Sequence, residues 1–362
     1  MSKRVGVLSA LAGTAAAGAA VVLAVDRSAS KLRRGLAAGV ALSQWPVDRR
    51  GRIVAQDGVG LYYEETGPVD APLTVVFVHG YCLQMGEFVF QRRALAEQFG
   101  SALRMVFFDQ RSHGRSDRSD SAHVSIDQLG RDLATVLDTL APRGPIVLVG
   151  HSMGGMAVMA LVGERPDLFA PPSAAATQRV VAVALLSTSA AKLATVTFGL
   201  PALLAKFTSG VLPLVLRGVR RQGELIERGR AVGTDLAWVI TRKLSFADGD
   251  VDPETVEYLS QMIGQTRIEV IADFYPALVS HDKLANLARL ADVDLVVVCG
   301  DRDYFTPLAH SRQIADAVPG AELVVIANAG HVALLERPEI VTAALVRMIA
   351  PALAATAKRR RR

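Results

Sequence analysis

From residue 53 onward, short apolar runs alternate with longer stretches that have helical periodicity. Six of these runs are apolar almost throughout, at residues 74–78, 105–108, 146–149, 180–186, 295–298 and 323–326. A strand that is apolar on both faces must be covered on both faces, and this is typical of parallel sheets with crossover helices. We therefore expect an α/β fold with a mostly parallel sheet covered by helices on both faces.

The alternation stops between residues 188 and 290, where helix-like pieces follow one another without a convincing strand. We expect this interval to form a helical cap, inserted between two parts of one core at residues 53–187 and 291–357. Near the start of the core, Asp57-Gly58 separates two β-type runs and predicts a hairpin turn. Residues 35–52 are expected to form a basic linker before the core.

Composition excludes several classes of protein. The chain has 362 residues, of which 51% are hydrophobic and 21% are charged, so a disordered chain is excluded. Cys82 and Cys299 are its only cysteines, which excludes a disulfide scaffold. Because no Cys/His cluster has zinc spacing, we expect no structural metal.

The positive charge of the chain is concentrated at its two ends. Residues 1–52 carry nine Lys/Arg and two Asp, and the tail at residues 358–362 is entirely basic. The net charge is only +5, so the body between them is acidic. A nucleic-acid-binding protein would carry its excess charge on a folded face, so we expect no nucleic-acid partner. Basic ends on an acidic body favour an anionic membrane surface, although solvated tails would have the same composition.

Residues 5–25 form an uncharged run that follows Lys3 and Arg4. Its 21 residues are long enough to cross a bilayer, and we expect residues 1–34 to be a membrane anchor. A cleaved signal peptide, which would imply secretion, and a helix packed on the body are the alternatives. Because the C-terminal flank of the run is the more basic, the positive-inside rule predicts a cytoplasmic catalytic body.

The segment Gly150-His151-Ser152-Met153-Gly154 matches the pattern G-x-S-x-G. An apolar run precedes it and a helical stretch follows it, as a nucleophile elbow requires. The glycines on both sides of Ser152 allow the close backbone approach of a sharp turn. At the start of the helix, the amide of Met153 is placed to bind an oxyanion.

These motifs resemble the α/β-hydrolase superfamily over about residues 53–353, and the elbow resembles that of esterases, lipases and monoacylglycerol-lipase-like members. His79-Gly80-Tyr81, just after an apolar run, resembles the oxyanion loop of the family. This resemblance implies that the Tyr81 amide is the second oxyanion donor beside Met153. Residues 109–116 resemble the loop written D-x-R-G-x-G-x-S, with Ser112 in place of a common Gly.

A serine hydroxyl needs a base, and a neutral histidine needs an acceptor that fixes its tautomer. The resemblance supplies both in the order Ser…Asp…His, as Ser152, Asp303 and His331. Asp303 ends a G-x-x-D segment after an apolar run, and His331 lies in a segment that matches the histidine loop of the family. Asp301 is two residues from Asp303, and we expect it to be a surface turn residue.

The sequence therefore predicts a serine hydrolase that cleaves carboxylic esters through an acyl-Ser152 intermediate, with lipid acyl esters as one candidate substrate class. Cofactor-free haloperoxidase or perhydrolase chemistry uses the same triad and stays open. A hydrolase-fold binding protein that has lost catalysis is a third possibility, which an intact triad disfavours. No P-loop and no G-x-G-x-x-G pattern occurs in the sequence, so no nucleotide cofactor is implied.

Overall fold

The structure is a computed structural model that describes residues 42, 45–171, 178–191, 193, 241–247 and 251–360. Its strands are β1 (Arg49–Val54), β2 (Gly60–Thr66), β3 (Leu73–Val78), β4 (Leu103–Phe108), β5 (Gly144–His151), β6 (Gln178–Leu186), β7 (Asp294–Gly300) and β8 (Glu322–Ile326). Its α-helices are α2 (Val89–Phe99), α3 (Ile126–Leu140), α4 (Met153–Glu164), α7 (Pro253–Gln265), α8 (Ile268–Ser280), α9 (Leu308–Ala317), α10 (Ala333–Glu336) and α11 (Pro338–Arg360). Its short 3-10 helices are η1 (Met85–Phe88), η2 (Gly100–Ala102), η3 (Ser121–His123), η4 (Pro166–Phe169) and η6 (Leu284–Leu290).

Within the described residues, eight strands form one sheet in the order β1-β2-β4-β3-β5-β6-β7-β8. The strands from β4 to β8 pair in parallel, whereas β2 is antiparallel to both of its neighbours. The expectation of a mostly parallel sheet is therefore confirmed. Since the carboxyl ends of parallel strands meet at one edge, the loops after β3, β5, β7 and β8 emerge together there.

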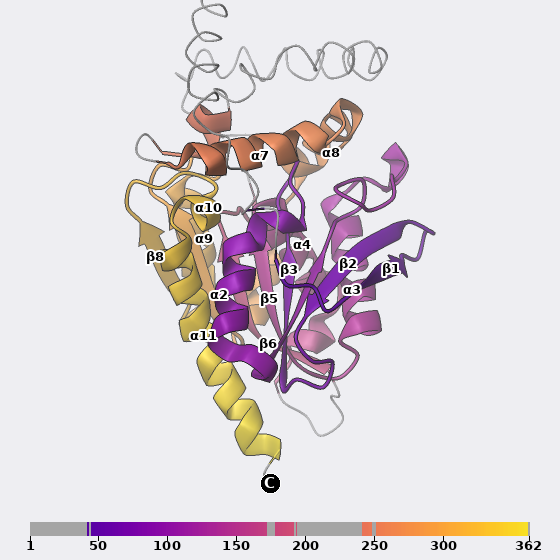
Figure 1. Cartoon of the computed structure of the whole chain (residues 1–362), viewed down its shortest axis with the longest axis vertical. Helices are drawn as coiled ribbons and strands as arrows, with labels where there is room; N and C mark the ends of the chain where they lie inside the picture. The colour runs from indigo at the N-terminus through magenta and orange to yellow at the C-terminus, as the bar shows by residue number, and fades with distance from the viewer. Residues whose placement is uncertain are drawn as a thin grey trace, which may run out of the picture.

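Helices cover both faces of this sheet, as Figure 1 shows. Strand β3 demonstrates why, because its side chains alternate between two apolar cores. Val76 and Val78 belong to the core that contains α3 and α4. Val75 and Phe77 belong to the core that contains α2 and α11. All six residues of β3 are buried, so its sequence has no polar face.

The first strand begins at Arg49, inside the segment 35–52 that was expected to be a linker. It is an edge strand in which exposed and partly buried residues alternate, so no apolar run marks it in the sequence. Two of its arginines form ion pairs, Arg49 with Glu65 at 3.2 Å and Arg52 with Asp117 at 2.7 Å. Charged side chains on an edge strand also discourage pairing with another chain.

Two helices of the interval 188–290, α7 and α8, lie across the carboxyl-end edge of the sheet (Figure 1). They contact the segment that follows β3, since the Tyr258 hydroxyl donates to the Gly86 carbonyl at 2.8 Å. The Thr266 hydroxyl likewise donates to the Cys82 carbonyl at 3.0 Å. Residues 194–240 lie outside the described residues, and the expected boundaries of the cap stay a prediction.

The last helix, α11, runs to Arg360 and so includes part of the expected tail at residues 358–362. Among the described residues, it alone is long and apolar enough to cross a membrane, over Pro338–Thr356. One face of it is buried against the sheet, and 33% of its apolar window is buried. It is therefore weak evidence for a membrane span. The expected anchor at residues 5–25 lies outside the described residues.

Candidate active site

Ser152 lies on a sharp turn between β5 and α4. Its backbone has φ 51° and ψ −117°, a region that costs a non-glycine residue about 1–3 kcal/mol. The turn is tight enough that a Cβ added at Gly150 would lie 2.7 Å from the Gly154 carbonyl oxygen. A Cβ added at Gly154 would lie 1.9 Å from the Val78 carbonyl oxygen. Glycine is therefore required at both positions, as the elbow pattern predicts.

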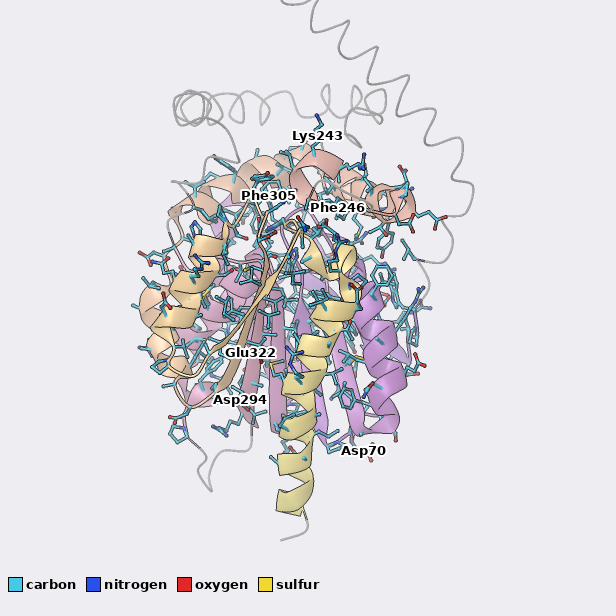
Figure 2. All side chains as sticks on the ribbon, turned by 90° about the vertical axis from the view of Figure 1, so that its left-hand side faces the viewer. Asp70, Lys243, Phe246, Asp294, Phe305 and Glu322 are labelled. Carbon is cyan, nitrogen blue, oxygen red and sulfur yellow. The ribbon has the colours of Figure 1, made fainter. Side chains whose placement is uncertain are left out.

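The structure brings Ser152, His331 and Asp303 together at the carboxyl-end edge of the sheet. His331 Nε2 lies 2.9 Å from Ser152 Oγ, and His331 Nδ1 lies 2.9 Å from Asp303 Oδ2. The Asp303 carboxylate can only accept, so the hydrogen sits on Nδ1 and Nε2 is left to accept from the serine hydroxyl. Figure 2 shows Phe305, two residues beyond Asp303, beneath the cap helices, with Asp294 and Glu322 at the opposite end.

Asp303 is fixed by its own turn as well as by His331. Its Oδ1 accepts from the amides of Phe305 and Thr306, each at 2.8 Å. Its Oδ2 accepts from the Thr306 hydroxyl at 2.7 Å. Burial raises the pKa of Asp303, but His331 and these donors outweigh burial and lower the pKa below its ordinary value. The side chain is therefore held as a carboxylate that orients His331.

Asp301 lies in a surface turn, as the sequence predicts. It is an exposed turn residue, and its amide donates to the Ile326 carbonyl at 3.0 Å. The structure therefore brings Asp303, and not Asp301, to His331. Sequence reasoning missed Thr306, whose amide and hydroxyl both bind Asp303. The available signal was the spacing Asp-x-x-Thr, in which a side chain accepts from an amide three residues on.

The segments of the two expected oxyanion donors lie side by side. Tyr81 follows β3 by three residues, and Met153 is the first residue of α4. The added Cβ at Gly154 would also approach the His79 carbonyl oxygen to 2.7 Å, so the elbow rests directly on the loop after β3. The Tyr81 hydroxyl donates to the Ile271 carbonyl in α8, which fixes this loop to the cap. The oxyanion role of the two amides stays a prediction.

His79 holds the shape of the loop after β3. Its Nδ1 donates to the Gly80 carbonyl at 2.8 Å, and its Nε2 accepts from the Gln110 amide at 2.8 Å. The Gln110 side-chain amide donates back to the His79 carbonyl at 2.6 Å. Complete burial keeps the pKa of His79 well below its ordinary value, so the ring stays neutral. His79 thus acts on the backbone of this loop.

Residues 109–116 form a rigid support beneath this region. Arg111 is fully buried and makes two 2.6 Å hydrogen bonds to the carboxylate of Asp132. Ser112, where the family commonly has Gly, adopts φ 66°. That left-handed conformation explains the usual glycine, and the Ser112 hydroxyl is used locally to accept from the Ser119 amide at 3.0 Å.

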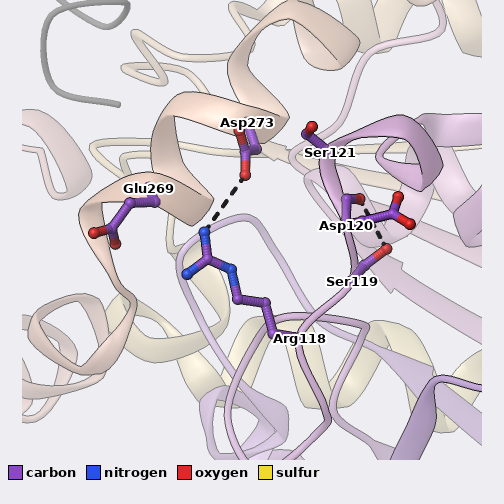
Figure 3. Close-up of a pocket in the computed structure, with 6 residues that line it drawn as sticks. All are labelled: Arg118, Ser119, Asp120, Ser121, Glu269 and Asp273. Carbon is purple, nitrogen blue, oxygen red and sulfur yellow. Dashed lines mark hydrogen bonds and ion pairs between the residues drawn. The ribbon is translucent and has the colours of Figure 1, made fainter. Parts of the chain in front are cut away.

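A cavity of about 260 Å³ opens between α8 and the segment before α3 (Figure 3). Its lining among the described residues is polar and consists of Arg118, Ser119, Asp120, Ser121, Glu269 and Asp273. Arg118 reaches Asp273 across it at 3.9 Å. No triad residue lines this cavity, so we do not assign it to the substrate. Within the described part of the chain, no three His, Cys, Asp or Glu side chains gather as a metal site.

The two neighbouring aspartates give a direct test of this geometry. We expect Asp303→Asn to lower kcat for an ester by up to about 10⁴-fold, because an amide at this position favours the wrong His331 tautomer. Asp301→Asn is the matched control and should change kcat by less than about threefold. Ester turnover and thermal unfolding of both variants measure the effect. Loss of turnover in the Asp301 variant alone would contradict the assignment.

Comparison with known proteins agrees with this architecture. The family model described as the alpha/beta hydrolase fold matches residues 74–338. A bifunctional esterase/perhydrolase from Acinetobacter calcoaceticus is 34% identical over 117 residues, which cover 32% of this chain and 40% of that protein. An sn-1-specific diacylglycerol lipase from Mus musculus is 38% identical over 100 residues, which cover 27% of this chain and 31% of that protein. These matches span less than half the length of each relative.

Solved structures extend the likeness over the whole body. An esterase from Thermogutta terrifontis superposes with a TM-score of 0.63 at 24% identity, covering 84% of this chain and 98% of that one. A bromoperoxidase from Bacillus anthracis superposes with a TM-score of 0.61 at 20% identity, covering 83% of this chain and 100% of that one. At these identities the likeness concerns the fold alone. With the family match over most of its length, the chain belongs to the α/β-hydrolase fold family.

Proposed function

We propose that this protein is a serine hydrolase that cleaves carboxylic esters through an acyl-Ser152 intermediate. The observation that carries the proposal is the hydrogen-bond chain from Ser152 Oγ through His331 to Asp303. Ser152 stands on a strained backbone turn at the end of β5, and all three residues are 9% exposed or less. Burial strengthens the electrostatic coupling between the three groups.

In the proposed first half-reaction, Ser152 Oγ attacks the ester carbonyl carbon while its proton passes to His331 Nε2. The resulting imidazolium is stabilised by the Asp303 carboxylate at Nδ1. The carbonyl oxygen becomes an oxyanion, for which we assign the amides of Tyr81 and Met153 as donors. The tetrahedral intermediate collapses when His331 gives the proton to the leaving alcohol, and the acyl group stays on Ser152.

In the second half-reaction, a water molecule replaces the alcohol. His331 Nε2 takes a proton from the water as the water oxygen attacks the acyl carbon. Collapse of this second intermediate breaks the bond to Ser152, whose oxygen recovers its proton from His331. The products are a carboxylic acid and an alcohol, and the enzyme returns to its starting state.

We extend the proposal to lipid acyl esters as the substrate class. One relative is named as a diacylglycerol lipase, which supports this choice without deciding it. The centroids of the Phe305 and His331 rings are 5.0 Å apart, so an apolar surface lies next to the proposed base. If acyl chains bind there, each additional buried CH₂ contributes up to about 0.8 kcal/mol, and kcat/KM should rise from acetyl to octanoyl esters.

Perhydrolase or haloperoxidase chemistry is the second candidate. The names of two relatives favour it, the esterase/perhydrolase and a non-heme chloroperoxidase from Streptomyces lividans. The chloroperoxidase is 34% identical over 105 residues, which cover 29% of this chain and 36% of that protein. Bromination of monobromodimedone with added hydrogen peroxide and bromide, measured beside hydrolysis of p-nitrophenyl esters, separates the two. The ester proposal requires hydrolysis to be the faster reaction when both are assayed with peroxide present.

Ser152→Ala is the primary test of the ester proposal. Without the nucleophile, ester turnover should fall by at least about 10⁴-fold, because the triad acts as a unit. Fluorophosphonate labelling should disappear as well. Ser112→Ala is the matched control, since Ser112 also has a positive φ but is not part of the triad, and it should keep both activities. Turnover by the Ser152 variant at the level of the unaltered protein would contradict the mechanism.

We also propose that residues 5–25 attach the protein to a membrane. Among the described residues, Leu42 and Trp45 are the first that pack on the body, and a Cβ at Gly86 would lie 3.2 Å from the Trp45 indole ring. Gly86 lies in the segment after β3, so the N-terminal segment joins the body at the edge that carries Ser152. In contrast, α11 ends at the opposite end of the body (Figure 1). An anchor in residues 5–25 would therefore bring the catalytic edge, and not the basic C-terminal end, towards the lipid.

Cell fractionation tests the proposed membrane attachment. Deletion of residues 1–34 should move the protein from the membrane fraction to the soluble fraction and keep ester turnover, because the triad lies wholly in the later body. A salt wash should leave the full-length protein in the membrane fraction if residues 5–25 span, since only surface attraction is screened. A full-length protein that is found in the soluble fraction from the start would contradict membrane attachment.

A further inference from the structure

A buried carboxylate lies below the active site, and neither the proposed mechanism nor the sequence motifs use it. Glu87 belongs to η1, which follows β3, and its side chain is 0% exposed. Its Oε1 accepts from the Gly80 amide at 3.1 Å, and its Oε2 lies 3.0 Å from His151 Nδ1. Gly80 precedes the assigned oxyanion donor Tyr81, and His151 precedes Ser152.

His151 continues this chain of contacts to the third catalytic segment. Its Nε2 lies 3.2 Å from the carbonyl oxygen of His331, and its ring is 0% exposed. Both ring nitrogens therefore face oxygen acceptors, an arrangement that favours a hydrogen on each nitrogen. Burial by itself lowers the pKa of His151, but the adjacent Glu87 carboxylate outweighs this and raises the pKa above its ordinary value.

We propose that the Glu87–His151 pair is a clamp that fixes the positions of the oxyanion loop, the nucleophile and the base relative to one another. The pair makes one hydrogen bond to the backbone of the oxyanion loop and one to the backbone of His331, and His151 itself is the residue before the nucleophile. Glu87 and His151 are thus positioning residues, since neither touches the reacting atoms. This inference rests on the proposed serine hydrolysis.

The burial of the pair explains why its partners cannot be removed singly. A buried charge that loses its partner destabilises a protein by about 3–5 kcal/mol, whereas replacement of both charges by apolar groups of similar volume is often neutral. The fit is also tight, because a Cβ at Gly80 would lie 2.9 Å from His151 Nδ1. A test of the clamp must therefore use substitutions that leave no unpaired buried charge. Two such variants separate the effect of the hydrogen bonds on turnover from the effect of the pair on folding.

Glu87→Gln keeps the connectivity while it removes the charge. The Gln carbonyl can accept from the Gly80 amide, and its NH₂ can donate to Nδ1 of a neutral His151. His151 Nε2–H then still donates to the His331 carbonyl. The double variant Glu87→Leu/His151→Phe keeps the volume of the two side chains but deletes all three hydrogen bonds.

The buried pair of Glu65 and Arg104 provides the matched control. Its two side chains are 4% and 7% exposed and approach to 2.6 Å, and Arg104 is the second residue of β4, towards the end of the sheet opposite the catalytic loops. Glu65→Leu/Arg104→Met therefore removes a comparable buried ion pair. This double variant should keep kcat, even if it unfolds at a lower temperature.

The test compares kcat and KM of these variants for a p-nitrophenyl ester, with reactive sites counted by fluorophosphonate labelling and folding followed by thermal unfolding. The Glu87→Leu/His151→Phe variant should lose about 10²-fold in kcat, comparable to the loss of one oxyanion donor, with KM changed by less than about threefold. Glu87→Gln should recover most of that loss. Undiminished kcat in the Leu/Phe variant, or equal losses in the Glu65/Arg104 control, would overturn the clamp.

The outcomes also distinguish this proposal from the one on which it rests. If the unaltered protein has no turnover that depends on Ser152, both proposals fail. If that turnover exists and Glu87→Gln is as slow as the Leu/Phe variant, the hydrogen bonds do not carry the effect and only the clamp fails. If the Leu/Phe variant does not fold, the test is the comparison of Glu87→Gln with the unaltered protein. A loss of kcat above about 30-fold in Glu87→Gln then contradicts the clamp.

Discussion

The backbone conformation of Ser152 is the constraint on which the rest of the site depends. A serine at positive φ persists only where its surroundings fix both sides of the turn. Here the Ser152 amide donates to the Leu186 carbonyl of β6 at 2.9 Å, and the Thr188 hydroxyl donates to the Ser152 carbonyl at 2.6 Å. The parallel pairing of β5 with its neighbours then presents the hydroxyl at the edge where the loops after β3, β7 and β8 also end.

The loop after β3 is the second feature that the site requires, and it is held from two sides. From below, Glu87 and His79 bind the Gly80 amide and the Gly80 carbonyl. From above, Tyr258 and Thr266 of the cap bind backbone carbonyls of the same segment. Movement of α7 and α8 would therefore act directly on the loop that carries the assigned oxyanion donor. The cap helices and the loop of the assigned oxyanion donor are thus joined by direct hydrogen bonds.

Much of this arrangement could be predicted from the sequence because it is local. The elbow glycines, the apolar runs and the order of Ser152, Asp303 and His331 are all visible as short motifs. The edge strand β1 begins earlier than the β-type run before Asp57, because its first residues include arginines in place of an apolar run. The clamp was missed because Glu87 and His151 are separated by 64 residues, and no short pattern encodes a contact between them. Such partners are defined only when the fold brings distant segments together.

The central claim is that Ser152 is acylated during turnover, and the most direct measurement is the mass of the protein during the reaction. When the protein is mixed with a p-nitrophenyl ester and quenched within one turnover, we expect the mass of one acyl group to be added. Peptide analysis should place this group on the peptide that contains Ser152, and longer incubation should remove it. An unmodified Ser152 during sustained hydrolysis, or an acyl group on another residue such as Cys82, would contradict the account.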